Sequence, residues 1–283
     1  MPDSRPPDAF TVDFEDWYQG LEIDMDEWDR FAPRVERGLA ILLDLLEVSG
    51  TRATFFVLGY QAERTPALIA EVAKRGHEIA SHGWSHRFVY RIGRDAFREE
   101  LRRSKTILED ITGVEVNGYR APFFSLTKQS LWAFDILFEE GFRYDSSVFP
   151  VINYRYGIPG ARRTAAPLST PSGATLLEIP LSTLRVPRLT IPMSGGGYFR
   201  LYPYALTRAM VRQLHRRNEP LVFYVHPWEF DVDHPRIRMP GRVAQFTHYH
   251  KLGSMAPKTQ RLLQDFRFTT LRDAYGDAIR GVR

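Results

Sequence analysis

Two histidines, His82 and His86, lie four positions apart in the motif SHGWSH, directly after a short run typical of a β-strand. Gly83 between them allows the chain to turn, so that both imidazoles can face one ion. The chain has no cysteine, so a transition metal must be held by histidine and carboxylate ligands. This motif therefore predicts a site for a divalent metal, most simply Zn²⁺.

Four more polar clusters directly follow predicted strands. They are TVDFEDW (Thr11–Trp17), YRAPF (Tyr119–Phe123), YDSSVF (Tyr144–Phe149) and VHPWEF (Val225–Phe230). In a parallel barrel the carboxyl ends of all strands share one face, so residues far apart in the sequence can meet there. Hydrolysis of an amide needs a nucleophilic water, a polarised carbonyl and a proton for the leaving amine. The clusters contain candidates for each of these tasks.

The elements that would position these clusters alternate between short β-branched or aromatic runs and longer stretches with helical spacing. We expect strands at 10–14, 53–58, 78–81, 118–120, 144–145, 176–179 and 221–225, and helices near 35–50, 66–76, 94–111 and 127–140. Six or seven parallel strands in a chain of 283 residues predict an α/β fold, a parallel β/α barrel forming a single domain. Segments 151–172, 191–204 and 231–254 show neither period and are expected to be irregular.

Composition narrows the classes of partner. The net charge is +4, and the basic residues are spread along the chain, which argues against nucleic acid as a partner. The N-terminus, MPDSRPPDAF, has no apolar segment of the kind found in signal peptides, and no stretch is apolar enough to span a membrane. The expected location is therefore the cytoplasm, and the oligomeric state stays open.

In order and rough spacing, the five clusters resemble the motifs of the NodB-type polysaccharide deacetylases, carbohydrate esterase family 4. The sequence is most similar to the subgroup found at bacterial exopolysaccharide and PEP-CTERM protein-sorting loci. That subgroup carries a VDxEDW opening, HPWEFD, and a DUF3473-type extension similar to HYHKLGSMAPKTQRLLQDFRFTTL here. The resemblance implies a distorted β/α barrel over residues 1–230, with residues 231–283 as an extension packing on the same domain.

The resemblance also implies an activity. Proteins of this family use a divalent metal, most often Zn²⁺ and here expected at one per chain, to remove N-acetyl groups from N-acetylhexosamine residues of a polysaccharide. Asp13 corresponds to the general base and Arg120 to the arginine that holds it. His226 corresponds to the general acid, and Asp145 to the carboxylate that hydrogen-bonds this histidine.

The acidic motif departs from the family, which usually has two adjacent aspartates, one of them the third metal ligand. Here Asp13 is followed by Phe14, Glu15 and Asp16. Side chains alternate along a strand, which would place Asp13 and Glu15 on one face and favour Glu15 as the ligand. A strand that ends or bulges after Phe14 would present Asp16 instead, so both alternatives stay open.

Other departures limit what the resemblance implies. Phe123 stands where many relatives have tyrosine, so only its backbone amide is expected to stabilise the oxyanion, with Pro122 fixing the local backbone and bordering the substrate. The tryptophan usual after the motif YDSS is absent. Trp228 and Trp17 are expected beside the substrate, although core packing is an equal alternative for Trp17.

Three rival functions fit parts of this pattern. An allantoinase-like amidohydrolase acting on a small cyclic amide would share the fold but allow altered metal ligands, as the Glu15 and Asp16 pair permits. A catalytically inactive sugar-binding barrel should have lost one of the polar positions, and none is obviously replaced. A sugar isomerase would need further metal carboxylates at later strand ends. The deacetylase interpretation accounts for all five clusters.

Overall fold

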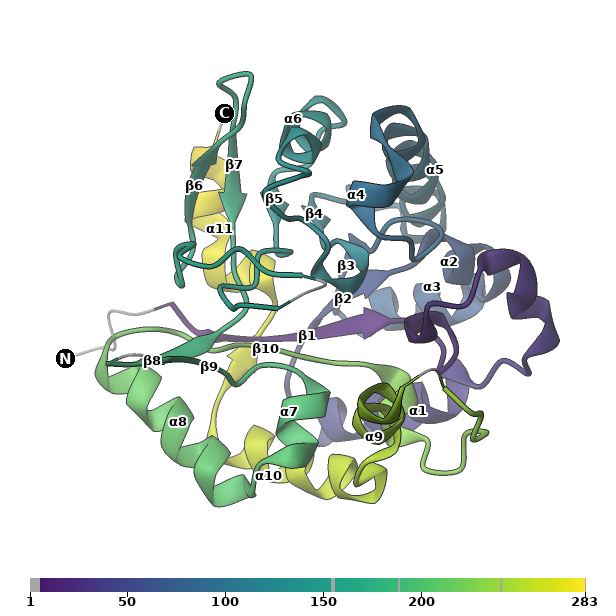
Figure 1. Cartoon of the computed structure of the whole chain (residues 1–283), viewed down its shortest axis with the longest axis vertical. Coiled ribbons are helices and arrows are strands. Elements are labelled where there is room, and N and C mark those ends of the chain that lie inside the picture. The colour runs from purple at the N-terminus through teal and green to yellow at the C-terminus, as the bar shows by residue number, and fades with distance from the viewer. Residues whose placement is uncertain (1–5, 154–155, 188, 240, 283) are drawn as a thin grey trace.

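The computed structural model describes residues 6–153, 156–187, 189–239 and 241–282. A curled sheet crosses the middle of the molecule, and helices lie on both sides of its strand β1 (Figure 1). The sheet contains β1 (Asp8–Phe14), β2 (Thr54–Val57), β3 (Glu78–Ser81), β4 (Gly118–Tyr119), β5 (Tyr144–Asp145), β6 (Ala166–Ser169), β7 (Thr175–Glu178), β10 (Val222–Val225) and β11 (Phe268–Thr269). Its order is β10-β1-β2-β3-β4-β5-β7-β6, with β11 also pairing with β1.

All neighbouring strands of this sheet run parallel except β6 and β7. The predicted α/β class is therefore confirmed, in the form of a curled, mostly parallel sheet that forms a half-barrel. All seven predicted strands are present, within one or two residues of their expected bounds. A separate hairpin is formed by β8 (Thr183–Val186) and β9 (Leu189–Pro192).

Serine side chains bridge the gap between the two ends of the half-barrel. Ser182 follows β7 in the chain, and its hydroxyl accepts a hydrogen bond of 2.8 Å from the amide of Val222 in β10. The hydroxyl of Ser194 donates to the carbonyl of Val222. The amide and carbonyl of Val222 in β10 are thus satisfied by side chains rather than by a paired strand.

The helices that follow the strands cover the outer faces of the sheet. They are α1 (Val35–Val48), α2 (Gly59–Arg64), α3 (Pro66–Lys74), α4 (Val89–Ile92), α5 (Arg94–Thr112), α6 (Trp132–Glu139), α7 (Gly196–Leu201), α8 (Tyr204–Arg216), α9 (Arg242–Tyr249), α10 (Met255–Asp265) and α11 (Leu271–Gly281). Shorter 3₁₀ turns are η1 (Gln19–Leu21), η2 (Met25–Arg30), η3 (Pro122–Phe124), η4 (Pro227–Phe230) and η5 (Leu252–Ser254). In α1, leucines at helical spacing form the buried face.

Three segments expected to be irregular contain regular structure. Segment 151–172 includes β6, segment 191–204 includes the second half of β9 and all of α7, and segment 231–254 includes α9. The sequence pattern did not predict α7 because the helix begins with two glycines, and glycine is among the poorest helix formers. Tertiary contacts described below explain why this helix forms.

The last residues of the chain complete the sheet and the helical layer. β11 pairs with the beginning of β1, and the amide of Leu271 donates to Thr54 Oγ1 over 2.8 Å. Helix α10 packs against α1, α7 and α8. Among the described residues, no helix combines the length and the apolar composition needed to cross a membrane.

Candidate metal centre and active site

Two histidines and one carboxylate converge at the carboxyl ends of β1 and β3. Glu15 directly follows β1, and His82 and His86 follow β3. All three side chains are buried, and one possible ligand atom from each lies within 4.8 Å of the others. The structure therefore brings together three of the four predicted metal ligands.

Hydrogen bonding fixes which nitrogen of His82 is available. Its Nδ1 lies 2.8 Å from the backbone carbonyl of Arg120. A carbonyl can only accept, so Nδ1 carries the proton and Nε2 keeps its lone pair, the usual arrangement of a metal-binding histidine. Burial lowers the pKa of His82 to about 4, which keeps the ring neutral at neutral pH.

Glu15 is ionised and held from two sides. Its Oε2 lies 2.6 Å from His86 Nε2, and its Oε1 accepts a hydrogen bond of 3.3 Å from the indole of Trp228. Burial raises the pKa of this carboxyl, but the charge and hydrogen bond of His86, followed by the charge of His226, outweigh burial and lower the pKa to about 2. A buried carboxylate that stays charged is suited to bind a cation.

Asp16, the alternative ligand, has a different set of partners. Its Oδ2 accepts hydrogen bonds from the amides of Arg34 (2.7 Å) and Val35 (3.0 Å), and its Oδ1 accepts from the amide of Trp17. It thus satisfies free amides at the beginning of α1. β1 ends at Phe14, and Glu15, the next residue, still faces the histidines, on the side that strand alternation predicts.

Asp13 and Arg120 form a buried ion pair beside the three ligands. Arg120 Nη1 donates to Asp13 Oδ1 over 2.7 Å and to Thr11 Oγ1 over 2.8 Å. The same guanidinium donates from Nε to the carbonyl of Ser146 and from Nη2 to its hydroxyl. It also lies 4.0 Å from the centre of the Phe56 ring. These contacts fix the orientation of the Asp13 carboxylate.

His226 follows β10 and faces the same carboxylates. Its Nε2 lies 4.0 Å from Asp13 Oδ2 and 3.6 Å from Glu15 Oε1. Burial lowers the pKa of His226, but the hydrogen bond that its ring donates to Glu229 and the surrounding carboxylate charges outweigh burial and raise the pKa to about 9. At neutral pH the ring is therefore a proton donor directed at the site.

The expected pairing of Asp145 with His226 is wrong. His226 Nδ1 lies 3.1 Å from Glu229 Oε2, whereas the carboxylate of Asp145 accepts from the amide and the hydroxyl of Ser147. That hydroxyl in turn accepts from the amide of Ala121. Asp145 thus supports the RAPF loop, because its strand β5 neighbours β4 and is distant in the sheet from β10.

Glu178, which the sequence analysis did not single out, is buried beside Asp145 on the neighbouring strand. Burial raises the pKa of Glu178 well above its usual range, and the nearby charge of Asp145 raises it further. Two adjacent buried carboxyls cannot both ionise, so Glu178 is the protonated partner. Its Oε1 also accepts a hydrogen bond from the amide of Val148.

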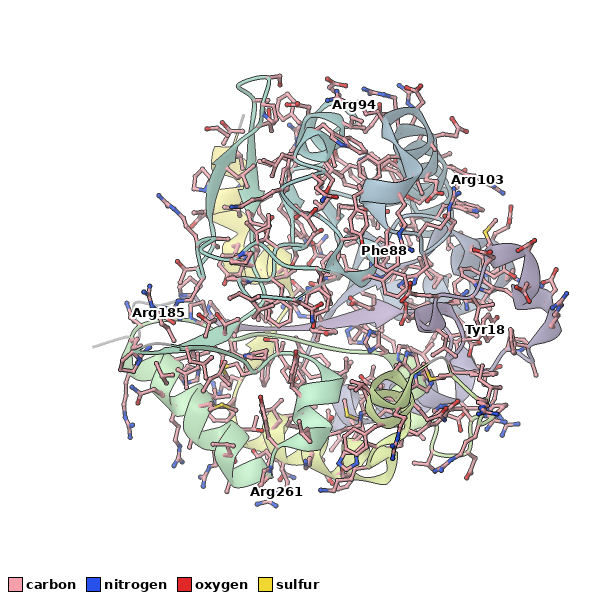
Figure 2. The ribbon with its side chains drawn as sticks, viewed as in Figure 1. Tyr18, Phe88, Arg94, Arg103, Arg185 and Arg261 are labelled. Carbon is pink, nitrogen blue, oxygen red and sulfur yellow. The ribbon has the colours of Figure 1, made fainter. Side chains whose placement is uncertain are left out.

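The RAPF loop turns back over the histidines. His86, Phe123 and Phe124 all have left-handed backbone conformations, with φ of 50°, 54° and 52°. Residues other than glycine rarely adopt this conformation, and such strain concentrates at functional sites. Pro122 begins the 3₁₀ turn η3, and the Phe123 ring packs 4.3 Å from His86 and stacks on Phe88 at 4.4 Å. Figure 2 shows Phe88 and Tyr18 around the carboxyl end of β1 and Arg185 toward its other end.

The two tryptophans have different environments. Trp17 is 1% exposed, donates to the carbonyl of Ala32 and packs among Tyr18, Phe31 and His234, so it has no free face for a sugar. This position favours the core-packing alternative. Trp228 bonds Glu15 and stacks on the ring of His226, so it contacts the active-site residues directly.

The donor set fits a divalent transition metal. Two imidazoles and one carboxylate are ligands that suit Zn²⁺ and its neighbours, and the chain has no cysteine that could supply a thiolate ligand. His86 Nε2 lies 2.6 Å from Glu15 Oε2, so this nitrogen and this oxygen are placed close enough to share one ion. Glu15, His82 and His86 would hold this metal.

Fold and site together define an α/β half-barrel with a centre of two histidines and one carboxylate. Two family matches identify this class further. Residues 29–135 match the family described as polysaccharide deacetylase, and residues 146–276 match a domain of unknown function, DUF3473. The chain therefore contains a polysaccharide deacetylase domain of the NodB type and a DUF3473 region.

Individual proteins share parts of this sequence. A peptidoglycan-N-acetylglucosamine deacetylase from Bacillus cereus is 31% identical over 93 residues, which are 32% of this chain and 34% of that protein. A peptidoglycan deacetylase from Helicobacter pylori is 28% identical over 113 residues, covering 40% of this chain and 38% of that protein. The chain thus matches little more than a third of the length of these relatives.

A solved structure extends the likeness of fold to the whole chain. It comes from Mycobacterium smegmatis and is described provisionally as a polysaccharide deacetylase. The comparison gives a TM-score of 0.61 at 23% sequence identity and covers 100% of this chain and 92% of that one. This similarity concerns the fold.

Proposed function

We propose that this protein removes N-acetyl groups from N-acetylhexosamine residues of a polysaccharide. The observation that carries the proposal is the arrangement at one end of the half-barrel. The three possible metal ligands lie beside Asp13, whose carboxylate is fixed by the buried Arg120. His226 Nε2 lies 4.0 Å from Asp13 Oδ2 and 3.6 Å from Glu15 Oε1. The matched deacetylase family and the two peptidoglycan deacetylases support the same chemistry.

The proposed roles follow from this geometry. A divalent metal, which we propose to be Zn²⁺ at one per chain, would activate water and polarise the acetyl carbonyl. Asp13, oriented by Arg120, accepts the proton of the attacking water. His226 gives a proton to the leaving amine. We propose that the amide of Phe123, the residue after Pro122, stabilises the developing oxyanion.

Trp228 differs from the other aromatic residues because it contacts both Glu15 and His226. We propose that Trp228 fixes the relative positions of the metal ligand Glu15 and the acid His226, and that it borders the substrate. The division into residues 1–230 and an extension 231–283 stays a prediction. So do the cytoplasmic location and the association with exopolysaccharide or PEP-CTERM loci.

The test measures released acetate. Protein loaded with Zn²⁺ is incubated with N-acetylglucosamine oligomers of increasing length and, separately, with allantoin. We expect acetate from the oligomers, with longer chains better than the monosaccharide because remote binding energy helps to orient the reacting amide. Turnover of allantoin without release of acetate from any N-acetyl sugar would establish the rival amidohydrolase. Binding of oligomers without turnover would indicate an inactive barrel.

A further inference from the structure

One carboxylate beside His226 has no role in the mechanism above. Glu229 is 1% exposed, and its Oε2 accepts hydrogen bonds from both the backbone amide (3.0 Å) and the Nδ1 (3.1 Å) of His226. Because a carboxylate accepts, Nδ1 must carry a proton, and Nε2 is left facing Asp13 and Glu15. Glu229 thus sets both the rotation of the imidazole and the nitrogen that points at the site.

Arg200 holds the other oxygen of Glu229. Its Nε and Nη2 each lie 3.1 Å from Glu229 Oε1, and the arginine side chain is 2% exposed. The remaining donors of this guanidinium bind the carbonyls of Thr247, His248 and His250 at the end of α9. A buried arginine with every polar contact directed at one carboxylate and one helix end is a fixed support rather than a mobile surface charge.

Gly196, at the beginning of α7, provides the space that this carboxylate occupies. A Cβ at this position would lie 1.9 Å and 2.0 Å from the two Glu229 oxygens. The carboxylate cannot retreat easily, because both oxygens are engaged and the group is buried. At Gly197, the next residue of the same helix, a Cβ would meet only a methyl group of Thr247 at 3.8 Å.

We propose that Glu229, held by Arg200 in the space left by Gly196, is the positioning residue for the general acid His226. All four residues belong to the region 146–276 that matches a domain of unknown function. In this chain, one function of that region is to supply the general acid His226. The same region fixes the acid in place through Glu229 and Arg200, which is itself bound to the end of α9. The inference rests on the proposed deacetylation for the role of His226.

The experiment uses two substitutions that reach the same carboxylate by different routes, with one matched control. Glu229→Gln keeps size but removes charge, Gly196→Ala displaces the carboxylate without altering it, and Gly197→Ala adds the same methyl one position later. In metal-loaded full-length protein we expect kcat for acetate release to fall roughly 10-fold to 100-fold in the first two variants, part of the effect of a positioned acid, with KM nearly unchanged. The control should stay within about twofold.

A double-mutant cycle separates positioning from general damage. If Gly196→Ala acts by displacing the carboxylate of Glu229, adding it to Glu229→Ala, which removes that carboxylate, should cause little further loss of kcat. Multiplying losses, or wild-type kcat in Gly196→Ala, would overturn the proposal. Metal content should be the same in all variants, because none of these residues is a proposed ligand. Should Glu229→Gln not fold, Gly196→Ala against Gly197→Ala decides the question alone.

A second readout is independent of turnover and of metal. In chelator-treated protein labelled with ¹⁵N-histidine, the Nδ1 proton of His226 should give a low-field signal protected from exchange, assigned by its loss in His226→Gln. The signal should disappear in Gly196→Ala, shift to higher field in Glu229→Gln, whose uncharged amide oxygen is a weaker acceptor, and persist unchanged in Gly197→Ala. This pattern without any acetate release would retain the positioning by Glu229 and refute the proposed function. Acetate release with the signal unchanged in all variants would refute the positioning and retain the function.

Discussion

Replacing Arg120 with methionine should destabilise the protein strongly as well as inactivate it. The guanidinium is fully buried, and its removal deprives Asp13, Thr11 and both oxygens of Ser146 of their donor. Removing one partner of a buried ion pair costs about 3–5 kcal/mol, because the remaining charge is left buried and uncompensated. We expect Arg120→Met to lower the free energy of unfolding by about this amount.

The companion variant distinguishes charge from packing. In Arg120→Met/Asp13→Asn the uncompensated carboxylate is gone, so roughly half of the lost stability should return, while activity stays absent because the proposed base is missing. Urea unfolding followed by circular dichroism, in excess chelator, measures both variants without a contribution from metal binding. A double variant no more stable than Arg120→Met would show that the hydrogen bonds to Thr11 and Ser146, rather than the charge of Asp13, determine the loss.

Three further perturbations test other parts of the structure. Glu15→Gln should reduce the metal content measured by elemental analysis, whereas Asp16→Asn should keep the metal and lose about 1 kcal/mol of stability, since it weakens the amide contacts at the beginning of α1; metal loss in Asp16→Asn alone would reverse the assignment. Burial and nearby arginines lower the pKa of His77 to about 4, below the unfolded value of about 6.5. The neutral ring therefore contributes up to about 3 kcal/mol to the free energy of unfolding. This contribution is present above pH 6.5 and is lost as the pH falls toward 4. His77→Asn should flatten this part of the urea-midpoint profile, and an unchanged slope would contradict the reasoning. Gly38→Ala should destabilise by about 1–3 kcal/mol although alanine favours helices, because its Cβ would lie 1.8 Å from the carbonyl oxygen of Pro227; a gain in thermal midpoint would show that the two segments separate easily.

The position of the site could be predicted because a topological rule governs it. Once the polar clusters were recognised as following parallel strands, their meeting at one face required no knowledge of distances. The alternation of side chains also made Glu15 the ligand that strand geometry favours over Asp16. Strand order and side-chain alternation were sufficient to place Asp13 and Glu15, since Asp13 lies in β1 and Glu15 directly follows it.

The partner of His226 could not be predicted in the same way. Asp145 was assigned by resemblance, while Glu229 stood three residues after the histidine in the same motif. The close contact depends on a 3₁₀ turn that places the Glu229 side chain back over the histidine amide. Arg200 was missed because it lies in a helix whose first residues are glycines, and the reason for one glycine, space for a carboxylate, lies 33 positions further along the chain.

The pairing of β1 has a consequence for how the chain folds during synthesis. β1 is made first and pairs on one edge with β2, but its other edge pairs with β10 and β11, more than 200 residues later. Such distant partners slow folding, because a long loop must close before the contact forms. Until β10 has left the ribosome, the strand that carries Asp13 exposes an unpaired edge, which is a template for association with other chains. A nascent chain of this protein should therefore depend on chaperones until β10 has been synthesised, and the carboxylates proposed for catalysis become organised only after that point.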